Sequence, residues 1–192
     1  MEKRPLTQPL TPKEPLVNVK GWPLEVARLP SEIVTAVWGS SQLGGFTENE
    51  AAALKQYAEP RALHLFCGQS SIGDVRVDLD LTAKATVRTD VLDYLAAEPA
   101  KAFATVIADP PYSTKYQAEY AVDGKDFGGN EKNLGRLLKE MYRVCAPGGV
   151  LAFKHWFDPA WAGANLLHQI VTKYGGHRRI TLLTVYRKSG WG

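Results

Sequence analysis

The chain contains only two cysteines, Cys67 and Cys145, which excludes a disulfide framework and a cysteine-rich zinc site. No apolar run approaches the roughly 20 residues that a membrane-spanning helix needs. The N-terminal stretch MEKRPLTQPLTPKEP lacks the apolar segment of a secretory signal, so we expect a cytoplasmic protein that does not associate with membranes. Basic residues (23) and acidic residues (20) nearly balance, and the net charge of +3 permits a polyanionic partner without requiring one.

The 192 residues suffice for one domain with a sizeable core. Prolines 5, 9, 12 and 15 lie among polar residues at the start of the chain. We therefore expect an extended N-terminal arm over residues 1–30 and a single domain over residues 31–192.

Hydrophobic patterning predicts strands that alternate with helices from residue 62 onward. Strands are expected at 62–66, 75–80, 103–109, 150–156 and 179–187. Helices are expected at 31–39, 48–58, 90–97, 134–145 and 159–174. This order is typical of an α/β protein with a single doubly wound, mostly parallel sheet.

Ligands of such a sheet bind at the carboxyl ends of its strands. The residues that fall there are Phe66–Gly68, Asp80, Asp90 and Asp109–Tyr112. Asp90 is equally well placed as the N-cap of the helix that follows it. We expect these residues to line one edge of the sheet and to form a site without a metal ion.

The stretch VIADPPY (106–112) has a form that suits a planar amine. The Asp109 carboxylate and the Pro110 carbonyl can together accept both hydrogens of one –NH₂ group. Tyr112 offers a flat face on which a planar ring can stack, and the Pro110–Pro111 pair makes the spacing rigid. Two acceptors make the nitrogen lone pair available for attack on an electrophilic carbon.

These residues resemble the S-adenosylmethionine-dependent amino-methyltransferases that modify exocyclic amines of nucleobases. VIADPPY matches their catalytic signature, which places Asp109, Pro110, Pro111 and Tyr112 in the catalytic set. LHLFCG resembles the strand and turn that approach the cofactor, and LLKEMYRVCAPGGVLAF resembles the helix, turn and strand that follow the catalytic strand. The resemblance covers a catalytic core over residues 60–187 and implies a Rossmann-like class I methyltransferase fold with an antiparallel last strand.

The resemblance also implies the residues that bind S-adenosylmethionine. Asp80 matches the carboxylate expected at the ribose, and Asp90 falls where an acceptor for the adenine ring is expected. The implied cofactor residues are Leu65, Phe66, Cys67, Gly68, Asp80, Asp90 and Asp109.

The loop after Gly68 departs from the family pattern because it reads Gly68-Gln69-Ser70 instead of Gly-x-Gly. Asp80 also follows Gly68 by 12 positions, where a dinucleotide-binding fold has about 20. We therefore predict a first crossover helix that is shortened to one turn or absent. The helices at 31–39 and 48–58 are expected to cover the sheet face that this leaves bare.

The resemblance implies methyl transfer to a nucleobase, with adenine N6 in DNA favoured over RNA. The only sizeable insertion, 113–131, is too short for a target-recognition domain, which suggests a partner subunit that supplies recognition. One alternative is N6-adenine or N2-guanine methylation of ribosomal or transfer RNA. A second is a protein-glutamine methyltransferase or a non-catalytic subunit with this fold.

Overall fold

The computed structural model describes residues 34–39, 45–112, 127, 130–174 and 180–190. The predicted arm over 1–30 and most of the predicted loop over 113–131 lie outside these residues. The described strands are β1 (Val34–Gly39), β2 (Ala62–Leu65), β3 (Val75–Asp78), β4 (Val87–Arg88), β5 (Phe103–Ala108), β6 (Cys145–His155), β7 (Ala164–Tyr174) and β8 (Ile180–Lys188). The described helices are α1 (Glu48–Tyr57), α2 (Val91–Ala97) and α4 (Glu131–Val144).

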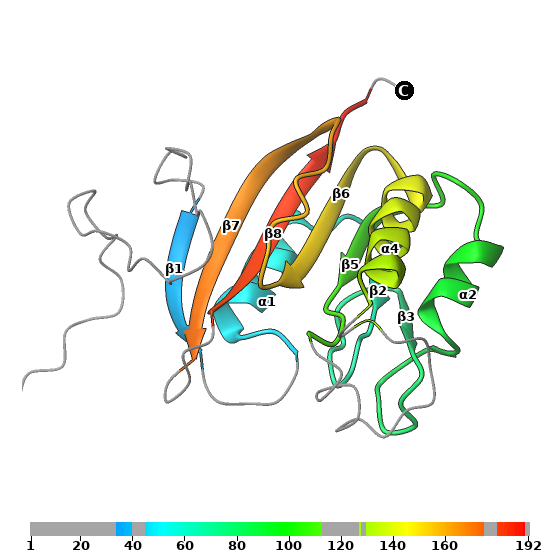
Figure 1. Cartoon of the computed structure of the whole chain (residues 1–192), viewed down its shortest axis with the longest axis horizontal. Coiled ribbons are helices and arrows are strands. Elements are labelled where there is room, and N and C mark those ends of the chain that lie inside the picture. Colours follow the sequence, from blue (N-terminus) through cyan, green and yellow to red (C-terminus); the bar gives the residue numbers. More distant parts are fainter. Residues whose placement is uncertain (1–33, 40–44, 113–126, 128–129, 175–179, 191–192) are drawn as a thin grey trace, which may run out of the picture.

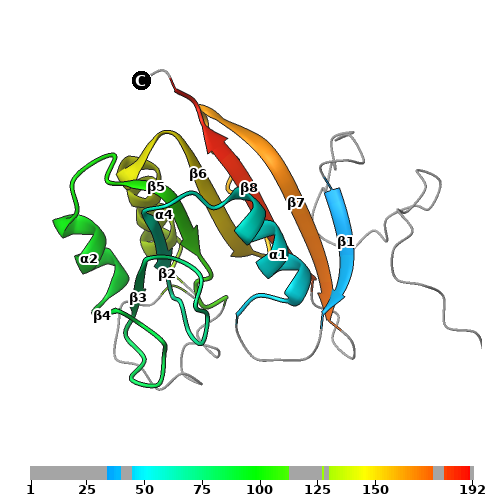
Figure 2. The same ribbon diagram turned by 180° about the vertical axis from the view of Figure 1, so that it is seen from behind.

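Within the described residues the strands form one eight-stranded sheet in the order β1-β7-β8-β6-β5-β2-β3-β4. Every neighbouring pair is parallel except the two that involve β8, which is antiparallel to both β6 and β7. Figures 1 and 2 show α2 and α4 on one face and α1 on the other. The sheet is therefore doubly wound and Rossmann-like, and the predicted fold class with its antiparallel last strand is confirmed.

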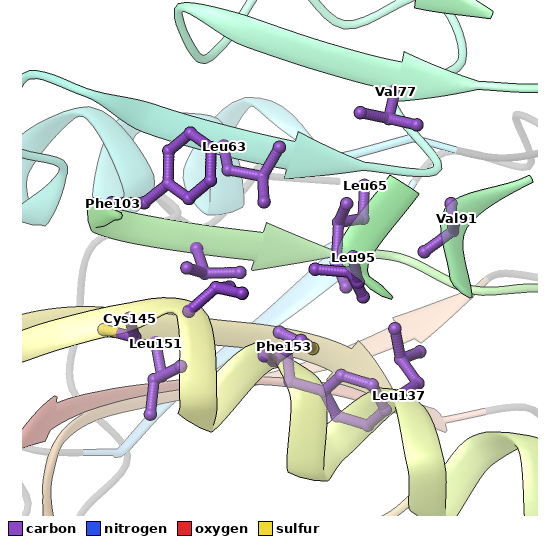
Figure 3. Close-up of a cluster of buried hydrophobic side chains, with 14 of the residues drawn as sticks. Leu63, Leu65, Val77, Val91, Leu95, Phe103, Leu137, Cys145, Leu151 and Phe153 are labelled. Carbon is purple, nitrogen blue, oxygen red and sulfur yellow. The ribbon is translucent and has the colours of Figure 1, made fainter. Parts of the chain in front are cut away.

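The core lies on both faces of the central strands because those strands are apolar on both sides. On one face, side chains of β2, β5 and β6 meet those of α2 and α4, as Figure 3 shows for Leu65, Leu95 and Leu137. On the opposite face, Ala53 and Leu54 of α1 pack against β5, β6 and β8. Strand β5 joins these two clusters, which holds its carboxyl end rigidly in place.

Two of the predicted helices are wrong, because both segments are strands. Residues 34–39 form β1, which pairs with β7 at the edge of the sheet, and residues 164–174 form β7 itself. The sequence Asp158-Pro159 resembles a helix start, but Asp158 instead binds the Ala160 amide at 2.8 Å and closes a turn. An aspartate side chain accepts a hydrogen bond from a nearby backbone amide both in turns and at helix starts. The pairing of residues 164–174 with β1 and β8 therefore determines that they form a strand.

Residues 66–74 contain no helix, so the first crossover helix is absent. This is one of the two forms that we predicted for it. The loop itself covers β2, because the Ile72 carbonyl contacts His64 Nδ1 at 3.0 Å and the Asp74 carboxylate accepts the Ala62 amide at 2.8 Å. Gly73 has φ +96°, and a side-chain carbon there would lie 3.1 Å from His64 Cβ. Only glycine lets this loop lie so close to the strand. Helix α1 then covers the same face further along, as predicted for residues 48–58.

Candidate active site

The predicted site residues follow four neighbouring strands that bring them to one edge of the sheet. These residues are Leu65 at the end of β2, Asp80 after β3, Asp90 after β4 and Asp109 after β5. The strands are parallel and lie in the order β5-β2-β3-β4, so their carboxyl ends meet at the same edge. The chain order reverses between β2 and β5, and such a switch point is where doubly wound sheets bind ligands.

The turn after β2 leaves open space beside Gly68 at this switch point. Phe66 and Gly68 both have left-handed backbone, with φ of 57° and 48°. Such a conformation is strained for phenylalanine and is characteristic of functional turns. A side-chain carbon at Gly68 would meet no atom within 4 Å, and the Gly68 amide is held by Asp78 Oδ2 at 2.8 Å. The turn can therefore be approached closely by a ligand.

Cys67 lies in the same turn but is not suited to act as a nucleophile. Its side chain is 1% exposed. Burial raises the pKa of the Cys67 thiol to about 11, so the thiol remains protonated at neutral pH. The residue contributes backbone and packing to the turn.

Asp80 uses one carboxylate oxygen to shape its own loop. Oδ1 accepts bonds from the Thr82 amide at 2.7 Å and the Thr82 hydroxyl at 2.9 Å, whereas Oδ2 accepts none from the described residues. Leu81, the next residue, is 82% exposed, which is unusual for a large apolar side chain. This edge thus offers one carboxylate oxygen beside an exposed apolar surface.

Asp90 is the N-cap of α2. Its Oδ1 accepts the amides of Leu92 at 2.9 Å and Asp93 at 3.4 Å. This is the capping alternative that the sequence left open. The residue still lies at the carboxyl end of β4, at the same edge as the other candidates.

The Asp109 carboxylate occupies a partly buried position directly after β5. The Tyr112 hydroxyl donates to its Oδ1 at 2.5 Å, while Pro110 between them is buried. Burial raises the pKa of Asp109 to about 6, and the Lys154 charge and the Tyr112 hydroxyl oppose that rise. The carboxylate is therefore ionised at neutral pH, yet close to the range in which it exchanges protons.

Aromatic side chains from the end of β6 extend the surface that Tyr112 begins. The Tyr112 ring centroid lies 5.1 Å from that of His155 and 5.9 Å from that of Trp156. Trp156 is 48% exposed, whereas His155 is 3% exposed and burial lowers its pKa to about 4. Trp156 therefore offers an accessible ring at this edge, whereas His155 belongs to the packed interior.

The sequence also missed the charged groups behind Asp109. Lys154 Nζ and Glu50 Oε2 form an ion pair at 2.9 Å with both side chains out of solvent. Glu50 also forms a capping box with Thr47 at the start of α1. A lysine inside the apolar stretch VLAFKHW was the available signal, because a buried lysine needs an anionic partner.

Comparisons with known proteins found similar solved structures only. No protein-family model matches the sequence, and no curated protein matches it. TrmN from Thermus thermophilus is 19% identical with a TM-score of 0.47, and the match covers 72% of this chain but 47% of that one. N-methyltransferase NodS from Bradyrhizobium japonicum WM9 is 15% identical with a TM-score of 0.46 over 72% of this chain and 91% of that one.

A third similar structure is the putative methylase HI0767 from Haemophilus influenzae, which is 16% identical with a TM-score of 0.41. The match covers 74% of this chain and 87% of that one. This chain thus spans about half of TrmN, the first of these structures. The chemistry of the residues at the sheet edge carries the functional interpretation.

The described residues include neither a membrane-spanning helix nor a cluster of metal-binding side chains. None of the described helices is long and apolar enough to cross a membrane. In the same part of the chain, no group of three or more histidine, cysteine, aspartate or glutamate side chains is arranged to hold a metal ion.

Proposed function

We propose that this chain is an S-adenosylmethionine-dependent N-methyltransferase that modifies the exocyclic amine of a nucleobase, with adenine N6 in DNA as the favoured target. The observation that supports it best is that Asp109 follows β5 directly, next to the strand that ends in the turn of Phe66–Gly68. Leu65 pairs with Ala108 across β2 and β5, so the two segments leave adjacent strands at the same level. A donor held at the turn and an amine held at Asp109 would therefore face each other.

The residues of this edge fit the chemical groups of S-adenosylmethionine. The open backbone at Gly68 suits its methionine part, and Asp80 Oδ2 suits a ribose hydroxyl. The exposed Leu81 side chain suits one face of its adenine ring, and Asp90 lies one strand further along. When bound, S-adenosylmethionine supplies a methyl carbon that is electrophilic because it is attached to a positively charged sulfur.

Asp109 and Pro110 act on the amine. Their oxygens accept its two hydrogens, which withdraws the nitrogen lone pair from the ring and directs it at the methyl carbon. As the new nitrogen–carbon bond forms, the bond between the methyl carbon and sulfur would break, with its electron pair staying on the sulfur, which leaves as a neutral thioether. One proton would then pass from the nitrogen to solvent. The Asp109 carboxylate accepts a hydrogen bond from that proton and stabilises the positive charge that develops there.

The aromatic surface of Tyr112 and Trp156 favours an aromatic ring, which can stack on it, over the amide group of a glutamine side chain. Stacking of a base on an aromatic side chain is worth about 1–3 kcal/mol. A base inside a duplex must first leave the stack, and such a surface offsets part of that cost. Asp109, in place of the asparagine that protein-glutamine methyltransferases more often carry, also supports a nucleobase. We expect a partner subunit to supply recognition of the DNA target.

A transfer assay with labelled S-adenosylmethionine tests the proposal. Duplex DNA, single-stranded DNA, transfer RNA and ribosomal RNA are offered separately, then digested to identify the methylated nucleoside. We expect N6-methyladenine from DNA. Label in RNA would replace the favoured substrate with the RNA alternative, and label in protein alone would refute the nucleic-acid assignment.

Calorimetry with S-adenosylmethionine provides an independent test of cofactor binding. Asp80→Asn should weaken binding, because the amide lacks the negative charge that favours ribose hydroxyls as donors. Asp93→Asn, an exposed change on α2, is the matched control and should bind as the wild type does. Absence of binding to the wild type would refute the enzyme assignment.

A further inference from the structure

A buried ion pair lies behind the candidate active site, on the face of the sheet that α1 covers. Lys154 of β6 is 1% exposed and Glu50 of α1 is 0% exposed. Removing two charges from water is costly, and apolar side chains of similar size are often at least as stabilising. Stability alone is therefore a weak explanation for the pair.

Glu50 connects three elements through its carboxylate. Oε2 accepts the Thr47 amide at 2.7 Å and Lys154 Nζ at 2.9 Å. Oε1 accepts the hydroxyl of Thr172, a buried residue of β7, at 2.8 Å. These bonds hold the start of α1 against β6 and β7, and with it the segment that precedes the helix.

Lys154 is the cross-strand neighbour of Asp109. Ala108 pairs with Phe153 in the β5–β6 register, so the next residue of each strand follows at the same level. The side chains of Ala108 and Phe153 belong to the core under α2 and α4, and side chains alternate along a strand. Asp109 and Lys154 are thereby directed to the α1 face.

Gly45 helps to hold the lysine beside the aspartate. Its carbonyl accepts a bond from Lys154 Nζ at 2.6 Å, in addition to the bond that Glu50 Oε2 accepts at 2.9 Å. The Tyr112 hydroxyl donates to the Asp109 carboxylate at 2.5 Å. The carboxylate is therefore held by a hydroxyl of its own segment and lies next to a lysine that other segments fix in place.

We propose that the Glu50–Lys154 pair is a positioning device for the reaction: Glu50 and the Gly45 carbonyl fix the Lys154 ammonium beside Asp109, and its charge holds the Asp109 carboxylate in the orientation that accepts a hydrogen of the substrate amine. This inference rests on the proposed function, because it assigns further residues to the same site. Glu50, Lys154 and Gly45 act through Asp109 and do not touch the substrate.

The charges around Asp109 add a second consequence. Three groups face its carboxylate: Lys154 from β6, Glu50 from α1 and the hydroxyl of Tyr112. The lysine charge and the hydroxyl lower the pKa of Asp109, whereas the glutamate charge raises it. Loss of the lysine alone therefore raises the pKa of Asp109 and moves its titration to higher pH.

Replacement of Lys154 by methionine is the primary test, because methionine keeps the length of the side chain and removes its charge. We expect kcat to fall by about tenfold or more while KM for S-adenosylmethionine stays within about twofold, since the residue acts on orientation and not on cofactor binding. The acid limb of the pH–rate profile should move to higher pH.

Lys188→Met is the matched control. Lys188 is also a largely buried lysine, and its Nζ binds the carbonyls of Tyr142 and Cys145 at 2.7 and 2.8 Å, away from the site. This variant should lose stability and leave the shape of the pH–rate profile unchanged. An equal drop of kcat and an equal shift of the acid limb in both variants would overturn the positioning role.

The double variant Glu50→Met, Lys154→Met covers the case in which the single change prevents folding, because it leaves no unpaired buried charge. We expect its melting temperature to stay near that of the wild type and its kcat to remain low, since the lysine charge beside Asp109 is gone. A wild-type kcat in this variant would refute the proposal.

A measurement without catalysis separates this inference from the proposed function. If the wild type transfers no methyl group to any nucleic acid, the proposed function fails, and Asp109 can still be titrated by carbon-13 NMR of its carboxyl group. If the Lys154 charge lowers the pKa of Asp109, the titration midpoint of Asp109 in Lys154→Met should lie above that in the wild type. An unchanged midpoint would refute the link between Lys154 and Asp109.

Discussion

Ionisation of Asp109 should destabilise the folded protein, because burial disfavours its charged form. Burial raises the pKa of this carboxyl from 3.8 to about 6. Between these two pH values the folded state binds a proton that the unfolded state has released, so the free energy of unfolding falls as pH rises through this window. The cost is fully present above pH 6 and is absent below about pH 4.

The magnitude follows from the size of the shift. About two pKa units at 1.36 kcal/mol each give an upper bound of about 3 kcal/mol. Asp109→Asn removes the ionisation and keeps an oxygen for the Tyr112 hydroxyl. At pH 8 we expect the Asp109→Asn variant to be more stable than the wild type by about 1–3 kcal/mol, and at pH 4 to be nearly equal to it.

Urea unfolding of both proteins at pH 4, 5, 6 and 8 measures this difference. Subtracting the two free energies cancels the other titrating groups, including the buried His64 and His155, whose lowered pKa values cause stability to fall as pH drops from 6.5 toward 4. Asp93→Asn, an exposed change, is the control. A difference that is constant from pH 4 to pH 8 would refute the reasoning, and one that grows toward low pH would reverse its sign.

Three further predictions concern activity. Methyl transfer should increase as pH rises through about 6, where Asp109 becomes ionised, and Tyr112→Phe should move this limb to higher pH because it removes a hydrogen bond to the carboxylate. Asp109→Ala should abolish methyl transfer and leave the affinity for S-adenosylmethionine, measured by calorimetry, within about tenfold of the wild type. Tyr112→Ala should lower the rate of methyl transfer more than Tyr112→Phe does, because stacking needs the ring. Trp156→Ala should raise KM for nucleic acid by about tenfold without lowering the melting temperature, whereas Leu81→Ala should raise KM for the cofactor only.

Each of these outcomes can fail on its own. If the acid limb of the pH–rate profile does not shift in Tyr112→Phe, the Tyr112 hydroxyl does not influence the pKa of Asp109. Equal loss of transfer and of cofactor affinity in Asp109→Ala would assign that residue to cofactor binding. If Trp156→Ala affects KM for the cofactor and the nucleic acid alike, the two sides of the site are not separate.

Some of the candidate site could be predicted because parallel strands align their ends. Apolar runs such as FATVIA identify strands buried on both faces, and the residue after each run lies at the carboxyl edge. Asp80 and Asp109 were located in this way without knowledge of their contacts. The loss of the first crossover helix could also be predicted from the sequence, because Asp80 follows Gly68 after only 12 positions.

The two segments that were wrongly predicted as helices show where local sequence patterns no longer determine secondary structure. Residues 164–174 contain Ile170, Val171 and Thr172, which favour a strand, but the preceding Asp158-Pro159 favours a helix. The choice depends on whether β1 and β8 are present on either side to complete the hydrogen bonds. The pairing of β1 with β7 joins residues more than a hundred positions apart, which a window of local sequence does not contain.

The sequence by itself determined the order of the central elements and the residues that end the central strands, because hydrophobic periodicity and chain order are local properties. Only the tertiary structure decided which groups surround the Asp109 carboxylate: the Tyr112 hydroxyl and the charges of Lys154 and Glu50. These contacts depend on the register of β5 with β6 and on the docking of α1. Their effect on the carboxylate is electrostatic, and it is set by distance and burial, which exist only once the chain has folded.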